Sequence, residues 1–287
     1  MSGRLEGQVA IVTGAGRGFG AAIARAFAAE GAAVALIARR KDEVDAVARA
    51  LKAAGGRALA IKADVTDVKD VARAVAATEK RFGPVTGLVN NAGRGGPYGP
   101  VGTFDPEDWW ASLEVHLKAP MMWMNAVLPG MRARKAGRII NVASLAGRQR
   151  IANMTAYCVG KGAQIQLTEH AALEVAEDGI STFAINPGLA FTEMAQHTLA
   201  SPEAHEHSPA IIEFLEKRKA MANSEEAFER CAEMCVDLAS GRCDRLTGRF
   251  LLVEEDRDQL MADLPEEPSQ TSALQHARAM RPPPAAE

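Results

Sequence analysis

Short apolar runs rich in β-branched residues alternate along the chain with longer segments whose apolar residues recur at helical spacing. The strand candidates cover residues 9–13, 33–37, 58–62, 87–90, 138–142, 182–186 and 250–253. The helix candidates cover residues 19–30, 43–54, 68–82, 106–133, 156–177 and 225–240. Because the strand candidates are apolar throughout, both faces of their sheet should be covered by helices. This order predicts an α/β fold with a doubly wound parallel sheet of seven strands flanked by helices.

Shifts in composition divide the chain. Residues 1–264 carry the alternating pattern and are predicted to form one domain. Five of the 14 prolines fall within residues 265–287, where strand formers nearly vanish, so this tail is predicted to be disordered. Residues 192–222 contain few strand formers and a charged helical stretch, and they lie where a mobile lid over a ligand cleft is expected.

The composition argues against several kinds of partner. The chain has 287 residues with 33 basic and 36 acidic side chains, so its formal charge of −3 gives no electrostatic reason to bind nucleic acid or a membrane surface. No apolar run approaches the roughly 20 residues that span a bilayer. The first residues lack the apolar stretch of a secretory signal, so a cytoplasmic location is expected. Cys231 and Cys235 lie one helical turn apart, but buried thiols are a simpler interpretation than a ligand pair, and no metal is predicted.

A glycine-rich turn lies between the first strand candidate and the first helix candidate. Glycine is needed where the backbone takes a positive φ or approaches a ligand closely. A helix N-terminus presents free N–H groups and a partial positive charge, which suit a pyrophosphate. This strand–turn–helix context favours a dinucleotide site over a plain tight turn. The predicted contacts are Gly14, Gly16, Arg17, Gly18, Phe19 and Gly20.

The end of the second strand candidate should decide which dinucleotide binds. An acidic residue there would hold the ribose hydroxyls of NAD. This chain has Arg39 and Arg40 instead, and Arg17 adds a third cation at the same end of the cleft. Arginine pairs well with a phosphate, so NADP(H) is favoured over NAD(H). Basic residues that only keep a loop soluble are the alternative.

Tyr157 and Lys161 lie four residues apart, and Tyr157 follows Ser144 by 13 residues. Residues four apart share one helix face, so the ammonium can lie beside the phenol. A free tyrosine has a pKa of about 10, and a nearby ammonium should lower it toward the range needed for proton transfer. Ser144 can donate to a substrate oxygen as charge develops there, although a serine that caps a turn is the alternative. With the glycine turn, these residues predict hydride transfer with Tyr157 as acid in reduction and base in oxidation.

In this order, the motifs resemble those of the short-chain dehydrogenase/reductase family over about residues 5–253. They are Thr13-Gly14-x-x-x-Gly18-x-Gly20, Asp64-Val65, Asn90-Asn91-Ala92-Gly93, Ser144, Tyr157-x-x-x-Lys161 and Pro187-Gly188, with Thr192 following. The resemblance implies a single-domain Rossmann fold and an NAD(P)-dependent interconversion of an alcohol and a ketone. At matching positions it places the adenine at Asp64 and Val65, the ribose side along Asn90, Asn91, Ala92 and Gly93 with Tyr157 and Lys161, and the nicotinamide at Pro187, Gly188, Leu189 and Thr192.

Two positions depart from the family pattern. His116 occupies the place where relatives often carry an asparagine that holds a relay water beside the lysine. Histidine can donate or accept, so a catalytic relay is still expected, with a pH dependence altered by titration near neutrality. A structural histidine at a helix distortion is the alternative. The other departure is the acidic run Glu254-Glu255-Asp256, where many relatives have aspartate-glycine-glycine, and it leaves subunit contacts and substrate type open.

The substrate is expected to be a small carbonyl or alcohol compound. Contacts are predicted from Ser144, Arg148, Tyr157 and Phe191, although a solvated loop charge is the favoured alternative for Arg148. Apolar residues in the lid segment favour a substrate with apolar bulk.

The two long helix candidates, 106–133 and 156–177, resemble those that form the interface of family dimers and tetramers. A homotetramer or homodimer is therefore expected. The apolar surface of the first helix is predicted from Trp110, Met121, Met122 and Trp123, with burial inside the monomer as the alternative.

Two other functions remain open from the sequence. One is a sensor that binds NADPH without turnover, which His116 and the altered final strand would allow. The other is a non-redox lyase or isomerase that uses Tyr157 for proton transfer alone. The complete set of Ser144, Tyr157 and Lys161 favours the redox enzyme.

Overall fold

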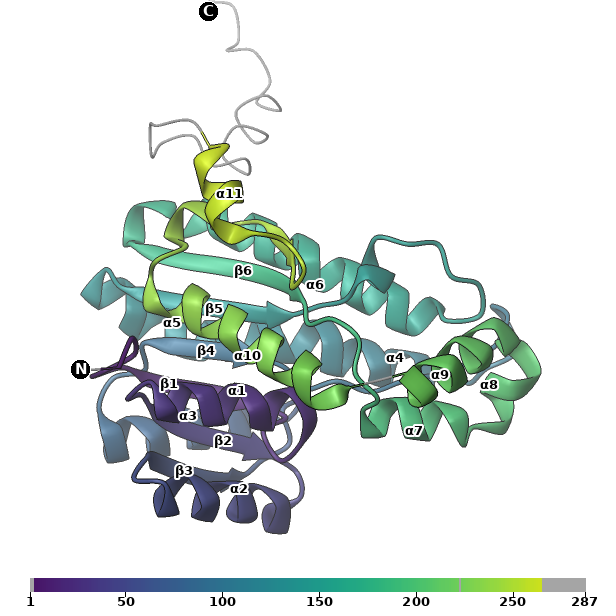
Figure 1. Ribbon diagram of the computed structural model, residues 1–287, viewed down its shortest axis with the longest axis horizontal. Coiled ribbons are helices and arrows are strands. Elements are labelled where there is room, and N and C mark those ends of the chain that lie inside the picture. The colour runs from purple at the N-terminus through teal and green to yellow at the C-terminus, as the bar shows by residue number, and fades with distance from the viewer. Residues whose placement is uncertain (1–2, 222, 265–287) are drawn as a thin grey trace, which may run out of the picture.

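One parallel sheet of seven strands forms the centre of the molecule, in the order β3-β2-β1-β4-β5-β6-β7 (Figure 1). The computed structural model describes residues 3–221 and 223–264, so the predicted tail at 265–287 lies outside the described residues. The strands are β1 (Val9–Thr13), β2 (Ala33–Ala38), β3 (Arg57–Lys62), β4 (Gly87–Asn90), β5 (Gly137–Val142), β6 (Ile180–Asn186) and β7 (Phe250–Leu252). The strand order reverses beside β1, which confirms the doubly wound fold.

Helices cover both faces of this sheet. One face is covered by α1 (Gly18–Ala29), α2 (Lys41–Ala53) and α10 (Ser224–Ser240), which lie in front of it in Figure 1. The other face is covered by α3 (Val68–Phe82), α5 (Ala119–Arg134) and α6 (Thr155–Glu174), while α4 (Pro106–Leu113) precedes α5 and α11 (Arg257–Ala262) follows β7. Within the described residues, no helix combines the length and apolar character required to cross a bilayer.

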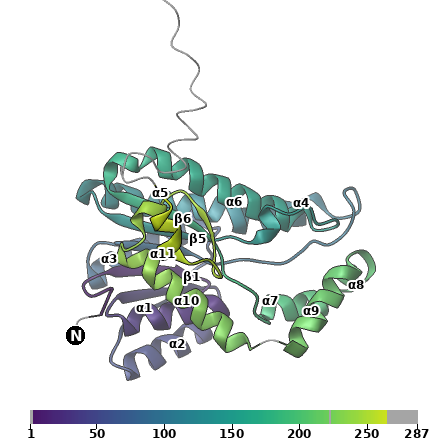
Figure 2. The same ribbon diagram turned by 45° about the horizontal axis from the view of Figure 1, so that its top comes forward.

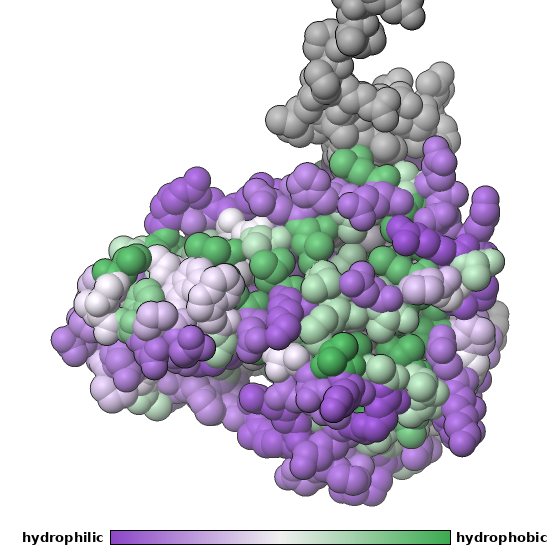
Figure 3. Space-filling model, turned by 180° about the vertical axis from the view of Figure 1, so that it is seen from behind, coloured by the Kyte–Doolittle hydropathy of each residue, from purple (hydrophilic) through white to green (hydrophobic). Residues whose placement is uncertain are grey.

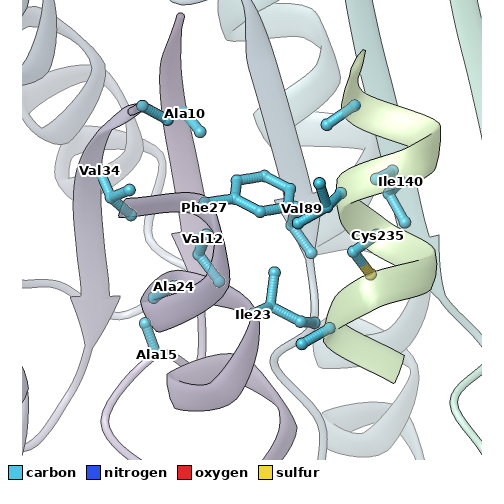
Figure 4. Packing of buried hydrophobic residues seen from close by; sticks show 14 of the residues in the cluster. Ala10, Val12, Ala15, Ile23, Ala24, Phe27, Val34, Val89, Ile140 and Cys235 are labelled. Atoms are coloured by element: carbon cyan, nitrogen blue, oxygen red, sulfur yellow. The ribbon is translucent and has the colours of Figure 1, made fainter. Parts of the chain in front are cut away.

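The two faces explain why the strands are apolar at every position. Successive side chains of a strand point to opposite sides of its sheet. Ala10 and Val12 of β1 pack with Phe27 of α1 on one side (Figure 4), whereas Ile11 belongs to the cluster on the other side that contains Trp123. Burying apolar area on both faces is the main favourable contribution to the stability of such a sheet.

Three of the four free cysteines belong to the first of these cores. Cys231, Cys235 and Cys243 are buried, and Figure 4 shows Cys235 among the apolar side chains beside α1. A hydrogen bond with Cys231 and burial both raise the pKa of the Cys235 thiol. These observations confirm the interpretation of Cys231 and Cys235 as buried structural thiols.

The long helix predicted over residues 106–133 is interrupted. Helix α4 ends at Leu113, a π-helical turn η1 spans Glu114–Lys118, and α5 begins at Ala119. The predicted helical segment is confirmed, but the π turn within it was not predicted, because apolar spacing on either side of a single wide turn still matches a helical period. A π turn is frequent at functional sites, and His116 lies within this one.

The lid segment (residues 192–222) leaves the end of β6 and extends away from the sheet, to the right of it in Figure 2. It contains three helices, α7 (Glu193–Leu199), α8 (Pro202–His207) and α9 (Pro209–Met221). Pro202 and Pro209 each begin a helix, as expected for a residue without an N–H at the first helical position.

Candidate active site

The turn between β1 and α1 requires glycine at several positions. Gly14 and Gly18 have positive φ angles of 64° and 52°, which side chains rarely adopt. A Cβ atom at Gly20 would overlap the carbonyl oxygen of Gly14, so α1 approaches the end of β1 as closely as a backbone can. At Gly16 a Cβ atom would come within 2.8 Å of the Glu43 carboxylate. Glycine is therefore required here both by the backbone conformation and by the close contacts of the turn.

The N-terminus of α1 has the properties of an anion site. Its N-cap residue, Arg17, makes no side-chain capping bond, and the first turn of the helix carries no acidic residue. By contrast, Asp67 caps α3 and Asp105 caps α4. The first N–H groups of α1 are thus left for a ligand, and a dinucleotide pyrophosphate fits them. Phe19 faces elsewhere, with its ring packed edge-on against Phe228 of α10 at 5.0 Å.

Asn91 holds the glycine turn in place through hydrogen bonds. Its side-chain amide donates to the carbonyl oxygens of Thr13 and Gly14 at 2.9 and 3.3 Å. The Thr13 hydroxyl accepts from the backbone N–H groups of Asn91 and Ala92. The segment after β4, predicted to line the ribose side, is thereby tied directly to the phosphate turn.

The three arginines predicted at the cofactor site, of which Arg39 and Arg17 were expected to contact a 2′-phosphate, differ in their surroundings. Arg40 pairs with Glu43 at 2.8 Å and with Glu193 of the lid segment at 3.1 Å. Arg17 also pairs with Glu193, and it lies 3.7 Å from Glu43. Arg39 is exposed and forms no ion pair with any of the described residues. The two glutamates were missed by the sequence analysis, although Glu43 could have been found from its position three residues after Arg40 on α2.

The predicted adenine contacts follow β3. Val65 is buried, and the Asp64 carboxylate accepts from the backbone N–H of Thr66 at 2.9 Å and from its hydroxyl at 2.7 Å. The backbone N–H of Asp64 donates to the side chain of Asp70. These bonds hold the turn after β3 in place, beside the end of β2 that carries Arg39.

Ser144 and Tyr157 come together where β5 ends and α6 begins. Ser144 caps the short 3₁₀ turn Leu145–Gly147 by accepting from the backbone N–H of Ala146 at 3.2 Å. The capping alternative is therefore realised, yet a hydroxyl that accepts one bond can still donate its own proton. Burial raises the pKa of the Tyr157 phenol, and its hydrogen bond with the Ser144 side chain acts in the opposite direction.

Lys161 lies one helical turn after Tyr157 and is buried in the interior. Its side chain is almost fully buried, and Nζ donates to the carbonyl oxygen of Val142 at 2.6 Å and to Oε1 of Gln164 at 3.2 Å. Burial lowers the pKa of the lysine to about 7. The expectation that this ammonium lowers the pKa of Tyr157 is corrected, because Nζ lies 6.0 Å from the ring centroid and burial of the phenol has the larger effect.

His116 lies against the same tyrosine. Its ring meets Tyr157 edge-on at 5.3 Å, and Nε2 is 2.8 Å from the carbonyl oxygen of Arg94. A carbonyl only accepts, so Nε2 carries the proton and Nδ1 presents a lone pair, which has no partner among the described residues. Burial, and after it the charge of Lys161, hold the pKa of His116 well below its usual value. The expectation of titration near neutrality was therefore wrong, although His116 does lie at a helix distortion beside the predicted catalytic residues.

Tyr157 also packs against a small cluster of buried apolar residues. The cluster combines the loop after β4, the loop before α6 and the lid segment, and its buried members are Tyr98, Met154, Ala204 and Ile212. The Tyr98 hydroxyl lies 2.6 Å from that of Thr198 in α7, and Asn153 donates to the carbonyl oxygen of His207. The bond between Tyr98 and the lid segment could not be predicted, since nothing in the sequence pairs residues 100 positions apart.

The segment after β6 enters the site through a second constrained turn. Gly188 has a φ of 83°, and a Cβ atom there would lie 2.9 Å from Val253 of the chain after β7. Next to Pro187 and Gly188, Leu189 is exposed, and Thr192 caps α7 by accepting from Ala195. These are the positions at which the nicotinamide was predicted.

Two predicted substrate contacts are engaged elsewhere. Phe191 donates its backbone N–H to the Ser224 hydroxyl at 3.0 Å and has Lys219 over its ring. Arg148 is exposed and pairs with Glu169 of α6. These contacts agree with the alternative of a solvated loop charge at Arg148.

Comparison with known proteins agrees with this geometry. The sequence pattern of the family described as short chain dehydrogenase matches residues 8–203. The chain belongs to the short-chain dehydrogenase/reductase family. A short chain dehydrogenase of Pseudocercospora fijiensis is 35% identical, with 92% of this chain and 86% of that protein covered. The 2-(S)-hydroxypropyl-CoM dehydrogenase 3 of Xanthobacter autotrophicus is 38% identical, with 72% and 81% covered.

A solved structure gives the same result for the fold. A metagenomic short-chain oxidoreductase in complex with NADP superposes with a TM-score of 0.67 at 33% identity, covering 83% of this chain and 92% of that one. The family binds NAD(P) and acts on small molecules. This short-chain dehydrogenase/reductase is accordingly an oxidoreductase acting on CH–OH groups.

Proposed function

We propose that this short-chain dehydrogenase/reductase interconverts a secondary alcohol and a ketone with NADP(H), and that Tyr157 is its general acid and base. The observation that carries the proposal is the convergence of Ser144, Tyr157 and Lys161 at the carboxyl end of β5. That edge of an open parallel sheet, next to its reversal of strand order, is where such folds bind ligands.

Each side chain has a separate task. When bound, NADP(H) supplies or accepts the hydride. Tyr157, whose pKa is raised by burial, keeps its proton at neutral pH and can give it to a ketone oxygen. Ser144 donates to the same oxygen and stabilises negative charge that develops there. Lys161 retains one N–H beyond the two donated to Val142 and Gln164, and this N–H is available to the ribose.

His116 is the proposed end of a proton path behind Tyr157. It is neutral at physiological pH, and its Nδ1 lone pair is the only acceptor that the ring offers. A neutral imidazole can hold a water molecule in the way an amide does. Its role is thus that of an acceptor with constant charge across the working pH range.

The preference for NADP(H) rests on positive charge at the end of β2. The two positions after β2 hold Arg39 and Arg40 rather than an acidic residue, and Arg17 lies in the glycine turn. The solved relative with bound NADP supports the same choice. The phosphate contact is assigned first to Arg39, since Arg17 and Arg40 are already paired with glutamates.

The proposed enzyme is a homotetramer or homodimer that associates through α4, α5 and α6. These helices carry the exposed side chains Trp110, Met121 and Val159, and Figure 3 shows hydrophobic residues gathered over the middle of this face. Trp123 is corrected to an interior residue, because it is fully buried in the core beneath α5. Light scattering coupled to gel filtration measures the oligomeric state.

The proposed chemistry is tested by Tyr157→Phe in an assay of NADPH oxidation with a panel of ketones. Loss of the proton donor should lower kcat by about 10²- to 10⁴-fold or more, while NADPH binding is largely retained. Tyr98→Phe is the matched control, since it removes the hydroxyl of the only other tyrosine and should keep measurable turnover. Equal activity of the Tyr157 variant and the unaltered enzyme would refute the assignment. Binding of NADPH without turnover of any ketone or alcohol would indicate the sensor instead.

A further inference from the structure

A line of buried polar residues runs along the inner face of α6. Lys161, Gln164 and Thr168 follow one another at helical spacing, and all three are buried. The Thr168 hydroxyl donates to the backbone carbonyl of Gln164 at 2.8 Å and accepts from the side-chain amide of Asn141 at 2.8 Å. Gln164 therefore lies between Lys161 and a hydrogen-bonded network that reaches into the sheet.

The chemistry of Lys161 and Gln164 determines how the amide is oriented. An ammonium has donors only, so the amide oxygen must be the atom that faces it. Oε1 of Gln164 accepts from Nζ at 3.2 Å, on the side not used by the carbonyl of Val142. Lys161 is thus held by two oxygen acceptors, one from the backbone of β5 and one from a side chain of its own helix.

The other end of the same amide has no partner. Nε2 of Gln164 is buried and lacks a hydrogen-bond partner among the described residues. An unpaired buried donor is unfavourable, and an apolar side chain at this position would avoid it. Retaining an amide here is consistent with a requirement for its oxygen.

We propose that Gln164 is a positioning residue for the reaction, because its amide oxygen fixes the Lys161 side chain and stabilises its ammonium in the buried site. The inference rests on the proposed function for its catalytic consequence. Burial alone favours the neutral amine, and the two oxygens oppose that effect. The charged lysine is then available on the side of Tyr157.

Few other groups can set the charge of this lysine. Tyr157 faces it from α6, with the ring centroid 6.0 Å from Nζ. His116 faces it from η1, and Arg94 lies beyond His116. Burial is the cause of the lowered lysine pKa, with no contribution from a carboxylate among the described residues. A change at Gln164 should therefore be seen directly in the titration of Lys161.

The experiment compares Gln164→Met, Gln164→Glu and, as matched control, Gln166→Met, whose side chain is exposed on the same helix. Lysine labelled with ¹³C at Cε reports the titration of Lys161 by NMR, and Lys161→Met identifies its resonance. Removal of the oxygen in Gln164→Met should lower the lysine pKa by about one unit, and the carboxylate in Gln164→Glu should raise it by about one unit. Gln166→Met should leave it unchanged.

The catalytic readout is the pH profile of kcat for ketone reduction. Its alkaline limb, where the required protons are lost, should move to lower pH in Gln164→Met and to higher pH in Gln164→Glu. A titration of Lys161 that is unmoved in both Gln164 variants, or moved in the same direction by both, overturns the proposal. If Gln164→Met does not fold, the direction of the shift in Gln164→Glu decides. The NMR titration needs no turnover, so an enzyme inactive toward every ketone would refute the proposed function separately.

Discussion

Replacing Arg39 by alanine should lower the affinity of the protein for NADPH but not its affinity for NADH. Arg39 follows β2 and is exposed without an ion pair among the described residues, so its charge is available to a 2′-phosphate. Arg17 and Arg40 face Glu193 and Glu43, which already neutralise much of their charge. Loss of Arg39 should weaken NADPH binding and leave NADH binding nearly unchanged, because NADH lacks that phosphate.

The size of the effect follows from the kind of bond that is lost. A hydrogen bond to a charged group contributes about 1.5–3 kcal/mol. At about 1.4 kcal/mol per factor of ten, that range corresponds to a rise of roughly ten- to a hundredfold in the dissociation constant for NADPH. Arg39 is exposed, and solvent and salt screen such a pair, so we expect a value of about tenfold.

Fluorescence titration of the protein with NADPH and with NADH measures both dissociation constants. Arg49→Ala is the control, since Arg49 is also exposed and lies on the neighbouring helix α2. Arg40→Ala should have a smaller effect than Arg39→Ala, because its guanidinium is already paired. An equal loss of affinity for NADH and NADPH in Arg39→Ala would refute the reasoning, and so would a larger loss in Arg40→Ala.

Two further changes test the contacts of the lid segment. Glu193→Gln removes the carboxylate that pairs with Arg17 and Arg40, so NADPH should bind a few-fold more tightly in the same titration; weaker binding would contradict a competition between this carboxylate and the phosphate. Tyr98→Phe removes the buried bond to Thr198 and should lower stability by about 1 kcal/mol, or Tm by about 2–4 °C in a calorimetric scan. An unchanged Tm would show that this bond adds nothing to the attachment of α7.

Local patterns were sufficient to predict most of the fold. β1, β4 and α3 have the predicted bounds, since an apolar run between turn residues and a helix between Asp67 and Gly83 are encoded within a few residues. The interruption at Glu114–Lys118 was missed, because a single π turn changes the spacing of side chains by only one residue. The predicted tail at 265–287 lies outside the described residues and stays a prediction.

The residues of the candidate site were predictable from the sequence, but their pKa values were not. Ser144, Tyr157 and Lys161 were found from their spacing, and the structure brings them together. The pKa values were not predictable in this way. Burial raises the pKa of Tyr157 and lowers that of Lys161. The burial of a side chain depends on how the whole chain packs and not on the residues next to it in the sequence.

By itself, the sequence determined the alternation of strands and helices, the glycine turn and the candidate catalytic residues, because each depends on residues close together in the chain. Only the tertiary structure decided that Glu193 reaches Arg17 and Arg40, and that Gln164 accepts a hydrogen bond from Lys161 in the buried interior. These contacts join elements far apart in sequence or depend on which face of a helix is buried. Their strength depends on the exclusion of water, which only the folded chain provides.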